Sequence, residues 1–169
     1  MNGAAMRPGS HEVVSQRLPQ SLYYEDIVVG QRFRTREHVV TNDDIQRFGD
    51  LTHDHHPLHT DDAFAQTMGF PRRIAHGLFS LSLMEGLKSE LGLYESTSVA
   101  SLGWDAVRFR KAVVSGEAVH VRVTFIEARL SSKGTHGIVT EQVDLCNAQG
   151  EVAVSSTHAA LLIRRPVSA

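Results

Sequence analysis

The sequence of 169 residues is poor in several features that would each indicate a particular class of protein. Its one cysteine, Cys146, cannot form an internal disulfide, which is typical of a reducing compartment. Lysine and arginine number 17 against 19 aspartates and glutamates, so the net charge of −2 offers no basic surface to nucleic acid or anionic lipid. The longest apolar runs, such as residues 159–163, are far shorter than a membrane-spanning helix. The sequence therefore excludes a disulfide framework and predicts neither nucleic acid nor a membrane as a partner.

What remains is the composition of an ordinary globular domain, with 41% hydrophobic and 21% charged residues. Residues 1–20 contain Pro8 and Pro19, show no periodicity and lack the apolar segment of a secretory signal. We therefore expect a flexible leader over 1–20, a single domain over 21–165, a short tail over 166–169 and a cytoplasmic location.

The first half of the domain predicts two short helices. Thr41 with Asp44 three residues later has the spacing of a capping box, and the apolar residues behind it predict a helix over 42–51. Thr60 is expected to cap the second short helix, which ends at Gly69.

A longer helix is predicted over 76–91, where apolar residues occupy most of the circumference, as in a helix buried in a core. The second half alternates between apolar and polar residues, as strands do when one face is buried. The predicted strands are 104–109, 119–125, 139–145 and 152–163. Short turns between successive strands favour an antiparallel sheet, so the expected fold class is α+β, with the sheet wrapped around the long helix.

Histidine is unusually abundant in this chain. Four of the ten histidines lie in the segment 53–59, His-Asp-His-His-Pro-Leu-His. Three interpretations fit this predicted loop. It is a solvated polar loop, a metal site, or an acid–base pair formed by Asp54 and His59. Neighbouring histidines cannot both reach one ion without strain, and the H-E-x-x-H zinc pattern is absent. Asp54 and His59 lie five residues apart across Pro57 and can converge on one water molecule.

The segment 54–59 resembles the active loop of the MaoC-like dehydratases, the (R)-specific enoyl-CoA hydratase branch of the hot-dog fold. That loop has the pattern Gly-Asp-x-Asn-Pro-aliphatic-His, which this chain matches at the aspartate, proline, aliphatic residue and histidine. His53 and His56 stand where the family has glycine and asparagine, and Ala112 stands where it has proline. Further segments that resemble the family are residues 24–33, 73–77 and 108–117.

This resemblance implies a hot-dog fold and a hydro-lyase that adds water to an enoyl-CoA or removes it from a 3-hydroxyacyl-CoA. It implies that Asp54 and His59 activate the water and that the Gly77 N–H stabilises the thioester enolate. The residues expected to contact substrate are His56, His76 and Gly77. Coenzyme A would enter as part of the substrate, so no cofactor and no metal are expected, and the implied assembly is a homodimer or higher homo-oligomer joined by edge strands. Independently, helix N-terminal amides favour developing negative charge, which suits the expected position of Gly77.

Two alternatives stay open at this stage. The first is an acyl-CoA thioesterase on the same fold, and the second is a non-catalytic domain that binds acyl thioesters. Arg72, Arg73 and Lys111 are candidates for contacts with coenzyme A phosphates. A metal-dependent hydrolase is a further minor interpretation of the histidine segment.

Overall fold

The computed structural model of the protein describes residues 13–166, so residues 1–12 of the expected leader and residues 167–169 of the expected tail lie outside it. The described end of the leader does not hang free. Strand β1 (Val13–Val14) pairs in parallel with β2 (Arg32–Arg34), and the Leu18 N–H donates to the Leu91 carbonyl. Residues 13–20 therefore pack against the domain, contrary to the expected flexible leader.

Helix α1 (Asn42–Thr52) confirms the predicted first helix and its cap. The Thr41 hydroxyl accepts the Asp44 N–H at 3.1 Å, and the Asp44 carboxylate accepts the Thr41 N–H at 2.8 Å. This reciprocal pair satisfies two backbone donors that the start of a helix leaves unpaired.

The next segment differs from the prediction in its details. Residues Pro57–Thr60 form a single helical turn, α2, so His59 lies in a short helix instead of a loop. Helix α3 (Asp62–Thr67) begins after Asp61, whose carboxylate accepts two backbone N–H groups. Thr60 is therefore not the cap. Sequence reasoning placed the start one residue early because Thr60 and Asp61 are both good N-caps.

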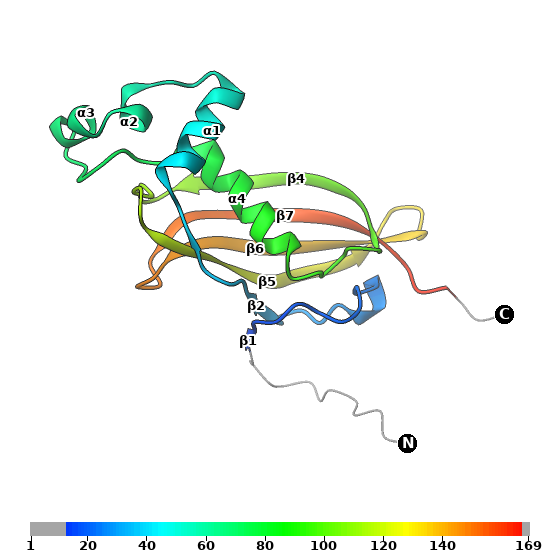
Figure 1. Ribbon diagram of the computed structural model, residues 1–169. Coiled ribbons are helices and arrows are strands. Elements are labelled where there is room, and N and C mark those ends of the chain that lie inside the picture. Colours follow the sequence, from blue (N-terminus) through cyan, green and yellow to red (C-terminus); the bar gives the residue numbers. More distant parts are fainter. Residues whose placement is uncertain (1–12, 167–169) are drawn as a thin grey trace.

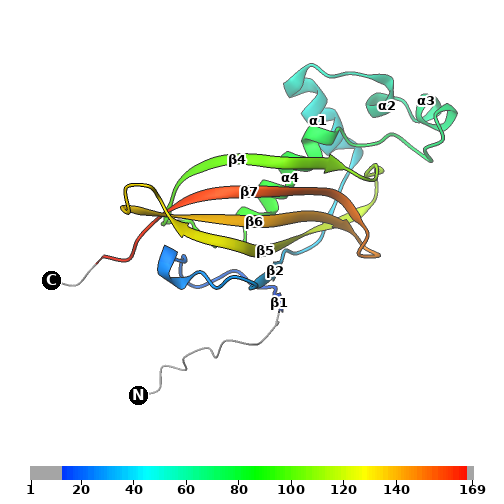
Figure 2. The same ribbon diagram turned by 180° about the vertical axis from the view of Figure 1, so that it is seen from behind.

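Helix α4 (Gly77–Ser89) corresponds to the predicted central helix and ends two residues earlier than expected. It lies across one face of the sheet, while Figure 2 shows the opposite face of the sheet without a helix over it within residues 13–166. Met84 and Leu87 are its most buried apolar side chains. None of the helices described in residues 13–166 combines the length and hydrophobicity needed to cross a membrane.

The sheet has the order β1-β2-β5-β6-β7-β4, with β3 (His38–Val39) paired beside β5, and its long strands run antiparallel. The long strands are β4 (Ser98–Phe109), β5 (Ala118–Leu130), β6 (His136–Asn147) and β7 (Val152–Ile163). A 3-10 turn, η1 (Tyr24–Asp26), precedes β2. The α+β prediction is confirmed. Strand β4 begins six residues before the predicted 104, because it is an exposed edge strand with little alternation to detect.

The core lies between α4 and the sheet. The alternating residues of β5 that the sequence assigned to the core, Val119, Val121, Val123 and Phe125, are fully buried. Helices α1, α2 and α3 gather at the end of the molecule where α4 begins (Figure 1). The fold therefore brings the histidine segment to the N-terminus of the central helix.

Candidate active site

The histidine segment is shaped by backbone turns at its two unusual residues. His53 ends α1 in the left-handed conformation, with φ of 62°, a region that favours glycine. His56 caps α2, and its Nδ1 accepts the Leu58 N–H at 3.2 Å. An asparagine side chain commonly makes this bond, and here the imidazole of His56 makes it.

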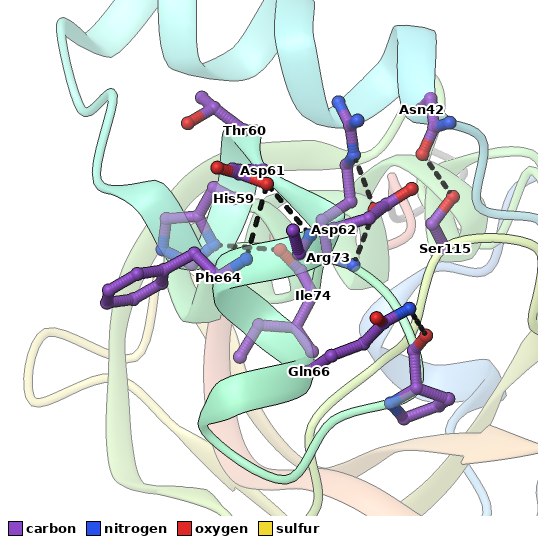
Figure 3. A network of polar contacts seen from close by, with 12 residues as sticks. Asn42, His59, Thr60, Asp61, Asp62, Phe64, Gln66, Arg73, Ile74 and Ser115 are labelled. Atoms are coloured by element: carbon purple, nitrogen blue, oxygen red, sulfur yellow. Dashed lines mark hydrogen bonds and ion pairs between the residues drawn. The ribbon is translucent and has the colours of Figure 1, made fainter.

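The His59 ring is held in one tautomer by the segment that returns from α3. Its Nδ1–H donates to the Ile74 carbonyl at 2.8 Å (Figure 3). The bond leaves Nε2 as the ring's acceptor. Burial lowers the pKa of His59, and the neighbouring His76 lowers it further, while the Ile74 bond and Asp54 oppose the shift. The neutral ring is thereby favoured, and its free nitrogen can accept a proton.

Asp54 is exposed, and a short turn directs its side chain. Its Oδ1 accepts the His56 N–H at 3.3 Å. One carboxylate oxygen of Asp54 and one ring nitrogen each of His59 and His76 lie within 4.8 Å of one another. A water molecule bonded to both the carboxylate and the His59 ring fits such a separation, since each hydrogen bond spans about 2.8 Å.

His76 contacts both Asp54 and His59. The side chain is only 3% exposed, and its Nε2–H donates to the Asp54 backbone carbonyl at 2.9 Å. Its ring stacks on His59 with centroids 3.8 Å apart. Its Nδ1 is buried and has no hydrogen-bond partner among the described residues. His76 therefore holds both members of the pair in place.

Gly77 is the first residue of α4, so its N–H has no partner within the helix. A Cβ atom at Gly77 would lie 3.0 Å from two atoms of the exposed Phe109 ring, so a side chain there would require that ring to shift. A cavity of about 320 Å³ opens beside this residue, and its lining includes His59, Gly77, Ser80 and Phe109. Asp54, His56 and His76 do not belong to this lining, although the first was expected to be catalytic and the other two to contact substrate.

An ion pair fixes the segment that carries the Ile74 carbonyl. The backbone N–H and the Nε of Arg73 both donate to one carboxylate oxygen of Asp62, each at 2.9 Å (Figure 3). The hydrogen bonds from Arg73 lower the pKa of Asp62. Arg73 is thus engaged within the domain, and Lys111 is likewise paired with Glu151, so two of the candidate phosphate contacts have partners already.

Asp54, His59 and His76 are also the residues that would hold a metal ion. They form the one group of three such side chains found close together in the part of the chain that the structure describes. His59 Nδ1 and His76 Nε2 already make hydrogen bonds. This leaves His59 Nε2 and His76 Nδ1 as the ring nitrogens that could coordinate a metal ion.

Several residues of the site were not found from the sequence. The Ile74 carbonyl acts through its backbone, so its side chain gives no signal. Phe109 and Ser80 look like ordinary strand and helix residues until the fold brings them to Gly77. Arg110 lines the same cavity, and its position after a strand end was the one signal available.

The chain is similar to known proteins over most of its length. The family model described as MaoC like domain matches residues 26–146. Protein MaoC of Klebsiella aerogenes is 32% identical over 106 residues, which cover 63% of this chain and 31% of that protein. The 3-hydroxybutyryl-CoA dehydratase of Methylorubrum extorquens is 31% identical over 106 residues, which cover 63% of this chain and 65% of that protein.

The solved structure of the MaoC-like dehydratase from Rhodospirillum rubrum superposes with a TM-score of 0.78 at 28% identity, covering 87% of this chain and all of that one. The expected hot-dog fold is confirmed by such structural neighbours. The chain spans about a third of the first of these curated relatives and just under two thirds of the second.

Proposed function

The chain belongs to the MaoC-like domain family, and from that premise we propose that it is a hydro-lyase acting on enoyl and 3-hydroxyacyl thioesters of coenzyme A. One observation carries the proposal. A carboxylate oxygen of Asp54 lies within 4.8 Å of a ring nitrogen of His59, and His59 lines a cavity that also reaches Gly77 at the start of α4. The names of relatives, among them 3-hydroxybutyryl-CoA dehydratase, support the same chemistry.

In this mechanism Asp54 and His59 hold one water molecule between them. Asp54 takes a proton as the water oxygen bonds to the β-carbon of the enoyl thioester, and the same proton is then delivered to the α-carbon. His59, fixed by the Ile74 carbonyl, orients the water through Nε2. The product is a 3-hydroxyacyl thioester, and the reverse sequence removes water from it.

The Gly77 N–H stabilises the negative charge that develops on the thioester oxygen. An amide at the start of a helix is unpaired and lies at the positive end of the helix dipole. One well-placed donor of this kind contributes about 3 kcal/mol to lowering the barrier. The glycine matters because a Cβ would meet the Phe109 ring and narrow the approach to the N–H.

Coenzyme A enters as the carrier of the substrate, and its phosphates need cations near the cavity mouth. The Arg110 guanidinium is the best candidate, because it lines the cavity and has no ion-pair partner in residues 13–166. Lys111 lies beside it but is engaged by Glu151.

The partner in this proposal is a second copy of the chain. Strand β4 is at the edge of the sheet and pairs on one side, with β7, in the described part of the chain. Its exposed apolar side chains Val99, Leu102 and Phe109 need a cover that a second copy would provide.

The test is a panel of trans-2-enoyl-CoA and 3-hydroxyacyl-CoA esters, followed in both directions by the absorbance of the conjugated thioester. Loss of that absorbance with enoyl substrates and its gain with hydroxyacyl substrates are expected, with the turnover unchanged after dialysis against a chelator. Release of free thiol without consumption of the double bond would contradict the proposal and indicate a thioesterase.

A further inference from the structure

Two successive aspartates, Asp61 and Asp62, make different contacts at the start of α3. Asp61 caps the helix, because one of its carboxylate oxygens accepts the N–H groups of Ala63 and Phe64. Asp62 is the first residue of the helix, and its carboxylate instead binds Arg73, 11 residues later in the chain. The start of α3 is therefore capped without Asp62, and the proposed mechanism does not use the Asp62 carboxylate either.

Asp62 binds both the main chain and the side chain of Arg73. Its Oδ1 accepts the backbone N–H and the Nε–H of Arg73, each at 2.9 Å, as Figure 3 shows. The side chains are 40% and 21% exposed, so the pair lies at the edge of the domain and is partly shielded from water. Because one of the two bonds goes to the backbone, Asp62 fixes the course of the chain at Arg73 as well as the direction of its guanidinium.

Ile74 follows directly and binds the one-turn helix α2 twice. Its N–H donates to the Leu58 carbonyl at 3.0 Å, and its carbonyl accepts the Nδ1–H of His59 at 2.8 Å. The two bonds engage consecutive residues of α2, one through the backbone and one through the ring that orients the water. A displacement of Ile74 would therefore change the orientation of the His59 ring.

The loop before β5 holds the other side of this segment. The Ser115 N–H donates to the Arg73 carbonyl at 3.1 Å, and Ile74 forms a β-bridge with Val114. The segment thus lies between α2 and this loop, as a strand lies between its two neighbours. Of the contacts named for it, the one to Asp62 is charge-assisted, and such bonds are about twice as strong as neutral ones.

The proposed chemistry depends on the Ile74 carbonyl. A neutral imidazole carries its proton on either nitrogen, and a hydrogen bond at one nitrogen decides which. With the proton on Nδ1, His59 presents Nε2 as an acceptor for the water that it shares with Asp54. With the proton on Nε2, the ring would lose this acceptor. Whatever holds the Ile74 carbonyl therefore also holds the working form of His59.

We propose that Asp62 and Arg73 are positioning residues of the active site, which hold the Ile74 carbonyl in place and through it keep the proton of His59 on Nδ1. Both side chains act through the Ile74 backbone. The inference rests on the proposed hydro-lyase function for its effect on turnover, while its effect on the His59 ring is independent of that function. It assigns Arg73 a role other than the coenzyme A phosphate contact that the sequence suggested.

The first experiment measures kcat and KM for hydration of crotonyl-CoA. Asp62→Ala should lower kcat by about 10- to 100-fold with KM nearly unchanged, because the His59 ring is misplaced while the cavity remains. Asp43→Ala is the matched control, since Asp43 also lies in the first turn of its helix and pairs with an arginine, Arg47, at 2.9 Å. This control should match the wild type in both constants.

The contacts of Oδ1 predict the order of two further variants. Arg73→Ala keeps the backbone N–H that binds Asp62, so it should lower kcat less than Asp62→Ala does. Asp62→Asn keeps an oxygen that can accept both N–H groups, so this conservative change should restore most of the kcat that Asp62→Ala loses.

The second experiment observes the tautomer of His59 directly. In the NMR spectrum of protein with histidine labelled with ¹⁵N, protonated and unprotonated ring nitrogens differ in chemical shift, and His59→Gln identifies the signals. At a pH where the ring is neutral, the wild type and Asp43→Ala should carry the proton on Nδ1. Asp62→Ala should also populate the form with the proton on Nε2. A change that only weakened the fold would lower the free energy of unfolding without moving these signals.

The outcomes separate this inference from the function on which it rests. Wild-type kcat in Asp62→Ala, an unchanged His59 tautomer in that variant, or an Asp62→Asn variant as slow as Asp62→Ala would each overturn the inference. Failure of the wild type to hydrate any enoyl-CoA ester would instead overturn the proposed function, and the tautomer would still show whether Asp62 positions the His59 ring.

Discussion

His53 and His56 show how two residues that depart from the family pattern keep the backbone that the pattern describes. His53 adopts the left-handed conformation in which the family places glycine, and His56 caps α2 where the family places asparagine. The sequence marked both positions as departures, but it did not indicate that they form a left-handed turn and a helix cap. Backbone conformation at a single residue leaves no periodic signal, and capping by an imidazole is uncommon.

The left-handed backbone at His53 predicts a stabilising substitution. His53→Gly should raise the free energy of unfolding by about 1 kcal/mol, because a side chain is strained in this region and glycine is not. His55→Gly is the matched control, since His55 does not have a positive φ, and it should lower stability slightly. Urea denaturation measures both. Equal losses in the two variants would contradict a strained turn.

The half-buried ring of His59 predicts how stability depends on pH. Its pKa is lowered in the folded protein, so on acidification the unfolded chain takes up the proton first. The free energy of unfolding therefore falls as the pH drops through the ordinary histidine value of about 6.5, and this loss ends below the folded pKa. His59→Gln removes the contribution and should lose less stability on acidification from neutral pH. The free energy of unfolding is measured by urea denaturation across pH. If it falls equally in the variant and the wild type, His59 does not make this contribution.

At the scale of elements, the regular parts were predictable and the junctions were not. The 42–51 helix and the 152–163 strand follow from capping and alternation, and the structure has them as Asn42–Thr52 and Val152–Ile163. The one-turn helix α2 and the first half of β4 were missed. A single turn is too short to show periodicity, and an edge strand exposed on both faces does not alternate. The proximity of Asp54 and His59 was predictable because the two residues lie five positions apart across a turn at Pro57.

The start of α4 predicts two separable effects of one methyl group. Gly77→Ala should lower stability by at most about 1 kcal/mol, because its Cβ would lie 3.0 Å from the Phe109 ring, which is exposed and can shift. It should also slow hydration, because the methyl group obstructs approach to the backbone N–H. Adding Phe109→Ala should restore most of the stability but not the activity. Recovery of activity in the double variant would mean that the glycine is needed for packing alone.

At the scale of the whole molecule, the sheet of residues 13–166 has β4 as an unpaired edge, and this strand ends beside the candidate active site. The sequence indicated an edge strand and, through the family resemblance, a homodimer. It did not indicate the buried contacts of Glu141 with Lys88 and His158, because these residues lie on three separate elements and look like isolated polar residues in the printed sequence. Only the folded chain brings them together.

The exposed apolar side chains of β4 predict a variant that dissociates. Leu102→Lys should convert the proposed dimer to a monomer, because it places a charge on the edge where a second copy would pack. Leu130→Lys, at the end of β5, is the control for a charge added to another exposed leucine. Light scattering after size exclusion gives the mass of each. A Leu102→Lys dimer as stable as the wild type would place the contact elsewhere.

The central claim is that Asp54 activates the water that is added to the enoyl thioester. The direct test is kcat/KM for hydration of crotonyl-CoA by Asp54→Asn, compared with Asp50→Asn, an exposed aspartate on α1 that bonds to Gln46. Asp54→Asn should lower kcat/KM by about 10²- to 10⁴-fold with little change in stability, whereas Asp50→Asn should match the wild type. An Asp54→Asn variant that hydrates crotonyl-CoA at the wild-type rate would contradict the account.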